Sequence, residues 1–112
     1  MTESLRTAAR LAKQIEETFT ARGAVYGPPE DNFANIAAFW GAWMLTRYDI
    51  HLSFDATDVG VMSALIKVAR LGETPSHEDS ALDAATYLLL AHGCVRTDGD
   101  QAGEIAPVVM AG

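Results

Sequence analysis

Proline and glycine break this chain into four stretches, and that punctuation constrains the fold more than any other feature of the sequence. Two glycines and two prolines fall within residues 23–29, residues 49–54 form a short connection, and a further break follows at residues 72–75. Between the breaks, apolar residues recur three and four positions apart, which is the period of an amphipathic helix. We therefore predict an all-α fold with helices over about residues 2–22, 30–48, 57–71 and 77–95.

Four helices with short connections are expected to pack as a four-helix bundle. The 112 residues fit one domain, which we assign to residues 1–96. Residues 97–112 are rich in Gly, Asp and Ala and are predicted to form a mobile, flexible tail. The last helix is apolar nearly all round, which places it at the centre. The bulky aromatic residues of the second helix favour a homo-oligomer, with a dimer as the simplest form.

The chain is acidic, with eight Lys and Arg against fifteen Asp and Glu and a formal net charge of −7. This balance argues against binding to nucleic acid or to an anionic membrane, because both need a basic face. The single Cys94 cannot form an internal disulfide, and no Cys and His residues have zinc-site spacing. No segment has the length and hydropathy of a signal peptide or a membrane span, so we expect a cytoplasmic protein.

Polar residues at the predicted helix starts are typical N-caps. Thr2 or Ser4 is expected to cap the first helix. Asp55 is expected to cap the third, with Asp58 at the third helical position completing a variant of the capping box. Ser76 is the expected cap of the fourth helix, whose first turn is acidic, as the helix dipole favours.

The most informative polar pattern lies on the fourth helix, where Asp79, Asp83 and Tyr87 follow one another at intervals of four. Asp83 is flanked by apolar residues, so we expect a buried carboxylate that is paired, hydrogen-bonded or bound to metal. Two acids four apart repel unless a cation lies between them. They therefore predict a divalent-metal site. The alternative is that Asp79 only complements the helix dipole and Asp83 takes a structural salt bridge.

Two basic residues on the third helix, Lys67 and Arg70, are the obvious partners of these acids. Both interrupt an apolar run, and together they could clamp a phosphate, with Arg70 giving paired hydrogen bonds and Lys67 a point charge. The alternative is that they neutralise Asp79 and Asp83. A mixed arrangement is also open, in which the acids hold the cations and the cations hold phosphate.

The loop before the second helix is the other candidate site. Gly27 could adopt a positive φ and Tyr26 could stack on a nucleobase, with Asn32 as an amide that reads the base. Glu30 is a candidate metal ligand, and so is Asp58 on the third helix. The alternatives are a rigid turn followed by first-turn acids at Glu30, and simple capping at Asp58.

These residues carry a family resemblance. The order Tyr26-Gly27, Asn32-Phe33, then 65–71 (LIKVARL) and 79–87 (DSALDAATY), resembles a small domain of unknown function common in phage and prophage genomes. That pattern is in turn similar to the nucleotide-modification-associated domains of phages, grouped with the MazG-like and dimeric dUTPase-like all-α NTP pyrophosphatases. The resemblance implies a helical bundle, usually dimeric or higher, in the host cytoplasm. It also implies cleavage of a nucleoside triphosphate to monophosphate and pyrophosphate, with Mg²⁺ held by acids from two helices.

The chain departs from that family pattern at most of the acids. The family carries Glu-Glu-x-x-Glu on one helix and Glu-x-x-Asp on the next, whereas here residues 16–17 (EE) lack the third acid and lie on another helix. Ser80 stands where the family has the Glu before Asp83. Only Asp83 therefore carries over directly, with Asp79 as a substitute one turn earlier.

Two hypotheses follow. The first is a Mg²⁺-dependent nucleotide pyrophosphohydrolase. Its metal ligands would be Asp79, Asp83, Glu30 and Asp58; its catalytic residues Asp79, Asp83, Lys67 and Arg70; and its substrate-binding residues Tyr26, Gly27, Asn32 and Tyr87. The second is a non-catalytic module that binds a nucleotide or a host protein. Acids converging around an open cleft would favour the enzyme, whereas closure of Asp83 by Arg70 would favour the module.

Overall fold

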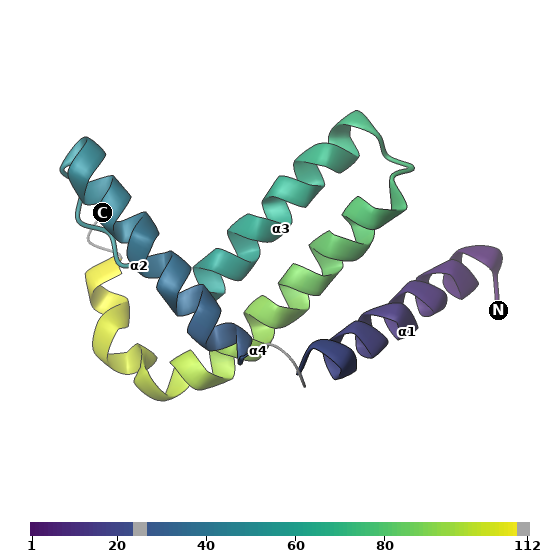
Figure 1. Ribbon diagram of the computed structural model, residues 1–112, viewed down its shortest axis with the longest axis horizontal. Coiled ribbons are helices and arrows are strands. Elements are labelled where there is room, and N and C mark those ends of the chain that lie inside the picture. Colours follow the sequence, from purple (N-terminus) through teal and green to yellow (C-terminus); the bar gives the residue numbers. More distant parts are fainter. Residues whose placement is uncertain (24–26, 110–112) are drawn as a thin grey trace.

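The computed structural model of the chain describes the backbone of residues 1–23 and 27–109 and the side chains of residues 1–22 and 27–95. It contains four helices: α1 (Glu3–Gly23), α2 (Pro29–Tyr48), α3 (Ala56–Glu73) and α4 (Glu78–Val109) (Figure 1). No strand occurs in this part of the chain. The prediction of an all-α fold is confirmed.

Helices α3 and α4 form an antiparallel pair that holds the fold together (Figure 1). Small residues let the two backbones approach closely. A Cβ placed on Gly60 would lie 2.6 Å from the Cβ of Ala91, which is closer than two carbon atoms can pack. Ala64 and Ala84 are buried as well. The absence of bulky side chains along this line therefore sets the spacing of the pair.

Helix α2 packs across the start of α3 and completes the core. The core cluster consists of Phe33, Ala37, Ala56, Val59 and Cys94. Its members come from α2, α3 and α4, so three helices share one apolar centre. Cys94 is buried in this centre.

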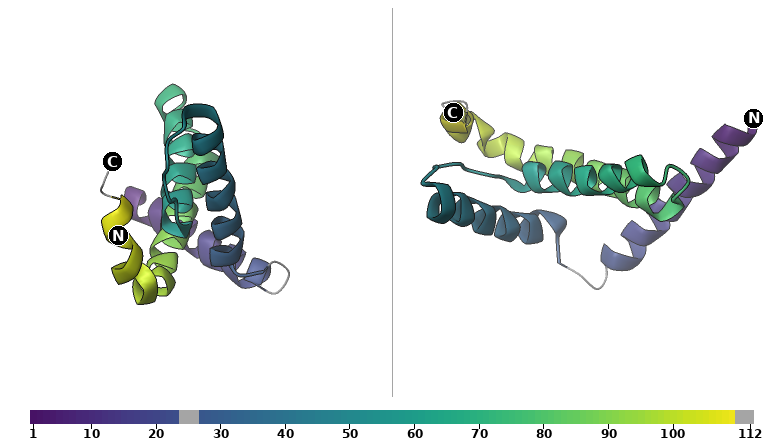
Figure 2. Two further views of the ribbon diagram at one scale, coloured as in Figure 1. Left: turned by 90° about the vertical axis from the view of Figure 1, so that its left-hand side faces the viewer. Right: turned by 90° about the horizontal axis from the view of Figure 1, so that it is seen from above.

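The connection between α2 and α3 runs back along α2 before α3 begins (Figure 2). It starts at Asp49, whose φ of 56° is the left-handed conformation that ends many helices. The carbonyl of Leu52 then passes over Gly41, where an added Cβ would lie 3.2 Å from its oxygen. The ring of Phe54 meets that of Trp40 edge to face, with 5.7 Å between centroids.

Helix α1 stands apart from this three-helix core. Among the described residues it packs only against α4, along the N-terminal half of that helix (Figures 1 and 2). One exposed ion pair joins the two, with Arg10 Nη1 2.8 Å from Glu78 Oε1. Helix α4 thus contacts all three other helices, as its nearly continuous apolar surface predicted.

Helical backbone continues through Thr97 to Val109, across the segment for which we predicted a flexible tail. In Figure 1 this last part of α4 curves away from the line of its first turns. The mobility of the segment, and its separation from residues 1–96, stay predictions, and residues 110–112 lie outside the described part of the chain. None of the described helices is long and apolar enough to cross a bilayer.

Two of the predicted helix caps are confirmed and one is wrong. The hydroxyl of Thr2 accepts a hydrogen bond from the Leu5 amide, and Asp55 forms the full capping box with Asp58. Helix α4, however, begins at Glu78, so His77 rather than Ser76 occupies the capping position. The ring Nδ1 of His77 accepts from the backbone N–H three residues on, as a capping oxygen would.

Candidate functional site

The predicted charged cluster consists of Lys67, Arg70, Asp79 and Asp83. One ion pair forms within it. Lys67 Nζ lies 3.1 Å from Asp83 Oδ2, which joins the last turns of α3 to the second turn of α4. The side chain of Asp83 is 46% exposed and that of Lys67 is 24% exposed. The expectation of a buried Asp83 is therefore wrong, since nearly half of its side chain remains exposed beside Lys67. A pair this exposed stabilises the fold by no more than about 1 kcal/mol.

The other two members of the predicted cluster point to solvent. Arg70 and Asp79 are both exposed, and neither takes part in an ion pair formed by the described residues. Among the described residues the ion-pair partner of Asp83 is therefore Lys67, and Arg70 does not close off Asp83, which was the arrangement that would have favoured the module. Asp79 lies in the first turn of α4, where an acid complements the helix dipole.

A polar contact that the sequence did not reveal lies beside this cluster. Ser80 is only 2% exposed, and its Oγ lies 2.6 Å from His77 Nδ1. The same nitrogen accepts from the Ser80 amide at 3.3 Å, so His77 carries its proton on Nε2 and the serine hydroxyl donates. In the sequence, the only sign of this contact was that a histidine at the start of the helix is followed by a serine three residues later. The contact satisfies a buried hydroxyl and fixes the start of α4.

The predicted nucleobase pocket is not assembled around the loop before α2. Tyr26 lies outside the described residues. Gly27 and Asn32 are exposed, and no atom would contact a Cβ on Gly27 within 4 Å. Tyr87 is half-buried against the core instead, with its ring centroid 6.5 Å from that of Phe33. The assignment of these residues to a substrate stays a prediction.

The candidate metal ligands are spread over three helices. Glu30 is half-buried in the first turn of α2, and Asp58 holds the first turn of α3, where its Oδ2 accepts from the Asp55 amide at 2.9 Å. In the part of the chain that the structure describes, no three His, Cys, Asp or Glu side chains come together in a way that could hold a metal ion. A magnesium site built from Asp79, Asp83, Glu30 and Asp58 therefore does not fit one copy of the chain.

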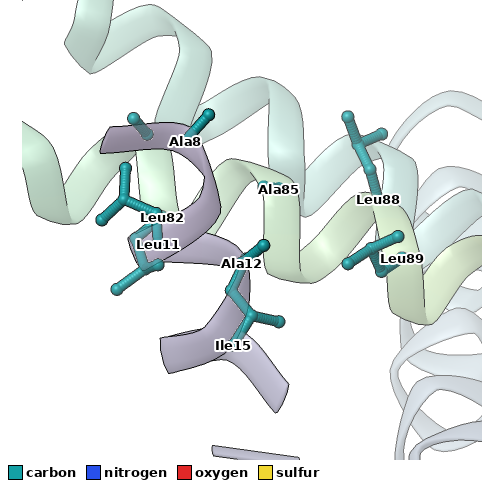
Figure 3. Close-up of a pocket in the computed structure, with 9 residues that line it drawn as sticks. Ala8, Leu11, Ala12, Ile15, Leu82, Ala85, Leu88 and Leu89 are labelled. Carbon is teal, nitrogen blue, oxygen red and sulfur yellow. The ribbon is translucent and has the colours of Figure 1, made fainter. Parts of the chain in front are cut away.

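An apolar groove lies between α1 and α4 (Figure 3). It encloses about 480 Å³. Its lining is entirely aliphatic, contributed by Ala8, Leu11, Ala12, Ile15, Ala81, Leu82, Ala85, Leu88 and Leu89. A pocket that recognises a small polar ligand needs some polar groups to orient it. This groove has none, so it does not resemble a nucleotide site.

One pair of titrating groups stands out, and it belongs to the contact between α1 and α4. The hydrogen bond and charge of Arg10 lower the pKa of the Glu78 carboxyl, and Glu78 raises the pKa of the Arg10 guanidinium. Both side chains are about half exposed. This pair ties α1 to α4 and is separate from the Lys67–Asp83 pair that joins α3 to α4.

Comparison with known proteins gives one family and one curated relative. A family model described as "Domain of unknown function (DUF6378)" matches residues 5–95. The "Gene 55 protein" of Mycobacterium phage L5 is 38% identical over 66 residues, which is 59% of this chain and 39% of that protein. The match thus spans about two-fifths of the relative's length. No solved structure matches.

Proposed function

Because this chain belongs to the DUF6378 family of domains of unknown function and has a phage-encoded relative, we propose that it is a non-catalytic phage module that acts by binding a host protein. The observation that carries this proposal is the Lys67–Asp83 bridge. Asp83 is the one acid that matches the pyrophosphatase pattern directly, and a lysine ammonium occupies the place beside it where a metal ion would sit. The remaining candidate acids do not converge there.

The surface of α2 supplies a binding element for such a partner. Phe39 and Trp43 are 75% and 60% exposed and lie four residues apart, so they share one side of the helix. Exposed aromatic side chains that are buried by a partner dominate the energetics of many protein interfaces. The acidic surface of the chain favours a partner with basic residues around an apolar contact.

The test compares capture of host proteins by three forms of the full chain. The first is the wild type, the second carries Phe39→Ser with Trp43→Ser, and the third is a control with Asn35→Ser and Thr46→Ser. Asn35 and Thr46 are exposed on the same helix, so the control changes α2 without removing aromatic surface. We expect one host protein to be retained at equal molar yield by the wild type and the control, and lost with the aromatic double variant. Equal capture by all three forms would place the binding elsewhere.

A nucleoside triphosphate pyrophosphohydrolase is the second candidate. It is favoured by one specific observation. The two segments that carry the family resemblance, 65–71 and 79–87, lie side by side in α3 and α4 and are joined by Lys67 and Asp83. Asp79 is accessible one turn before Asp83 on the same helix. Because no three candidate ligands come together among the described residues, hydrolysis would need further acids beside Asp79 and Asp83.

Nucleotide turnover separates the two candidates directly. The folded chain is incubated with each common nucleoside triphosphate, with and without Mg²⁺, and pyrophosphate release and thermal unfolding are recorded. The binding-module proposal predicts no release and no metal-dependent rise in melting temperature, since only a ligand that binds the folded state stabilises it. Release that disappears with Asp83→Asn and persists with Glu73→Gln would establish the enzyme instead.

A further inference from the structure

Helix α3 carries an apolar seam that no described residue of the chain covers. Val61, Leu65 and Val68 are 37%, 57% and 47% exposed. Their intervals of four and three are those of a coiled-coil seam, and Met62 and Ala69 flank the line on one side. Such a stripe buries its side chains well only against another helix. We call these five residues the α3 seam.

The other sides of α3 are already occupied. Gly60 and Ala64 face α4 and are buried, and Val59 belongs to the core shared with α2. The α3 seam lies on the remaining side of the helix, which is why its residues are exposed although their spacing predicted an apolar stripe. Of Val59, Met62, Leu65 and Ile66, only Val59 is buried.

The chain exposes more surface than a compact domain of its size. Its accessible surface is 8247 Å², whereas a compact monomer of 12.0 kDa exposes about 6000 Å². Its radius of gyration is 16.3 Å, against about 13 Å for a compact domain of this length. Part of this excess comes from α1, which stands apart from the three-helix core, and the exposed α3 seam adds to it.

Charge identifies a second copy as the occupant of the seam. The chain carries a net charge of −7, so two copies repel unless they meet on a neutral face. The stretch 59–66 of α3 has no charged residue. A basic partner chosen by the acidic surface of this protein would meet an acid only at the end of the seam, at Asp58, whereas an identical seam matches the five seam residues in both polarity and spacing.

We propose that two copies of the chain associate through antiparallel packing of their α3 seams about a two-fold axis at Leu65. In this register, the larger Val61 and Met62 lie opposite the smaller Ala69 and Val68 of the partner subunit. Parallel packing would instead bring the two Asp58 carboxylates together and align the helix dipoles. Closed two-fold dimers are also the commonest oligomers. The association is independent of whether the domain binds a host protein or a nucleotide.

The oligomeric state of the full chain tests this proposal. Sedimentation equilibrium of the wild type at micromolar concentration is expected to give the mass of a dimer. Leu65→Glu places two unpaired carboxylates in the interface and is expected to weaken association by at least about 100-fold. Ile66→Glu is the matched control, because Ile66 is 61% exposed but lies off the seam. Circular dichroism checks that both variants remain helical.

Cysteine cross-linking tests the direction of packing separately. A mixture of a Val61→Cys form and an Ala69→Cys form is expected to give a disulfide-linked heterodimer under oxidation, while Val61→Cys alone stays unlinked. The native Cys94 is 1% exposed and does not compete. A monomeric wild type, or a dimer that Leu65→Glu leaves intact, overturns the proposal. Efficient linkage of Val61→Cys to itself overturns the antiparallel register.

Discussion

Two of the contacts that helix α4 makes, the one with α3 and the one with α1, differ in kind. Toward α3 it presents small residues such as Ala84 and Ala91, and the backbones come so close that Gly60 has no room for a Cβ. Toward α1 it presents Leu82, Leu88 and other aliphatic side chains, and a groove of about 480 Å³ remains. Apolar residues line both sides. The size of the side chains, rather than their polarity, therefore decides which contact forms a core.

This difference has an energetic consequence. Dispersion attraction falls steeply when a gap opens between packed atoms, so the loose α1 contact contributes less for each apolar residue than the tight core. Regions with few buried contacts open locally at lower free energy than the core does. We expect α1 to open independently of α2, α3 and α4, and the following substitutions are chosen to expose or contradict that hierarchy.

The largest effect is expected in the three-helix core, at Phe33. This ring is 5% exposed and packs among residues from α2, α3 and α4. Phe33→Ala should lower the free energy of unfolding by about 3–5 kcal/mol, through lost burial and the cavity that remains. Urea denaturation followed by circular dichroism measures the change. A loss below about 1 kcal/mol would mean that this core is as loosely packed as the α1 contact.

The second largest effect is expected where α3 and α4 approach each other closely, at Gly60. Gly60→Ala should destabilise the fold by about 1–3 kcal/mol, because the new methyl group meets Ala91 and its backbone. The control is Gly72→Ala in the same helix, where a Cβ would contact nothing within 4 Å. That change should stabilise the helix by up to about 1 kcal/mol. Effects of the same sign at both positions would contradict a tight contact at Gly60.

A smaller and local effect is expected where α1 meets the groove. Ile15 is 6% exposed, but it lines an open groove rather than a filled core. Ile15→Ala should cost no more than about 2 kcal/mol, at the lower end for such truncations. Hydrogen exchange should show faster exchange in α1 while the amides of α3 keep their protection. Uniformly faster exchange throughout the chain would show that α1 unfolds together with the core.

The helices of this fold could be read from the sequence because they depend on local rules. Apolar spacing, the breaks at glycine and proline, and the acids at Asp55 and Asp58 each act within a few residues. Closeness of packing could not be read in the same way, since it depends on which residue of another helix lies opposite. Gly60 matters because of Ala91, which lies 31 positions away in the chain.

The candidate site shows the same limit. The sequence indicated that Lys67 or Arg70 would meet Asp79 or Asp83, and one of those four pairings forms. Which one forms depends on the rotation of α3 against α4, which the close contact at Gly60 sets. The exposure of Asp83 could not be predicted from its apolar neighbours in sequence, because it depends on how α3 packs against α4.

The smallest effect concerns the charge that ties α1 to α4. Because Arg10 lowers the pKa of Glu78, the ionised form of Glu78 favours the docked state of α1. This contribution is fully present above the ordinary pKa of glutamate, about 4.3, and is lost as the pH falls through the lowered value in the folded state.

Hydrogen exchange of α1 should therefore become faster as the pH falls below about 4, beyond the intrinsic pH dependence of exchange, while α3 is unaffected. Glu78→Gln should show the faster exchange already at neutral pH and lose the acid-dependent step. Glu73→Gln, in the last turn of α3, should keep it. Added salt should act in the same direction as Glu78→Gln, since the Arg10–Glu78 pair is exposed and screened by ions. If the acid-dependent increase in exchange persists in Glu78→Gln, another carboxylate controls the docking of α1. The contact between α1 and α4 is then stabilised by more than this one ion pair.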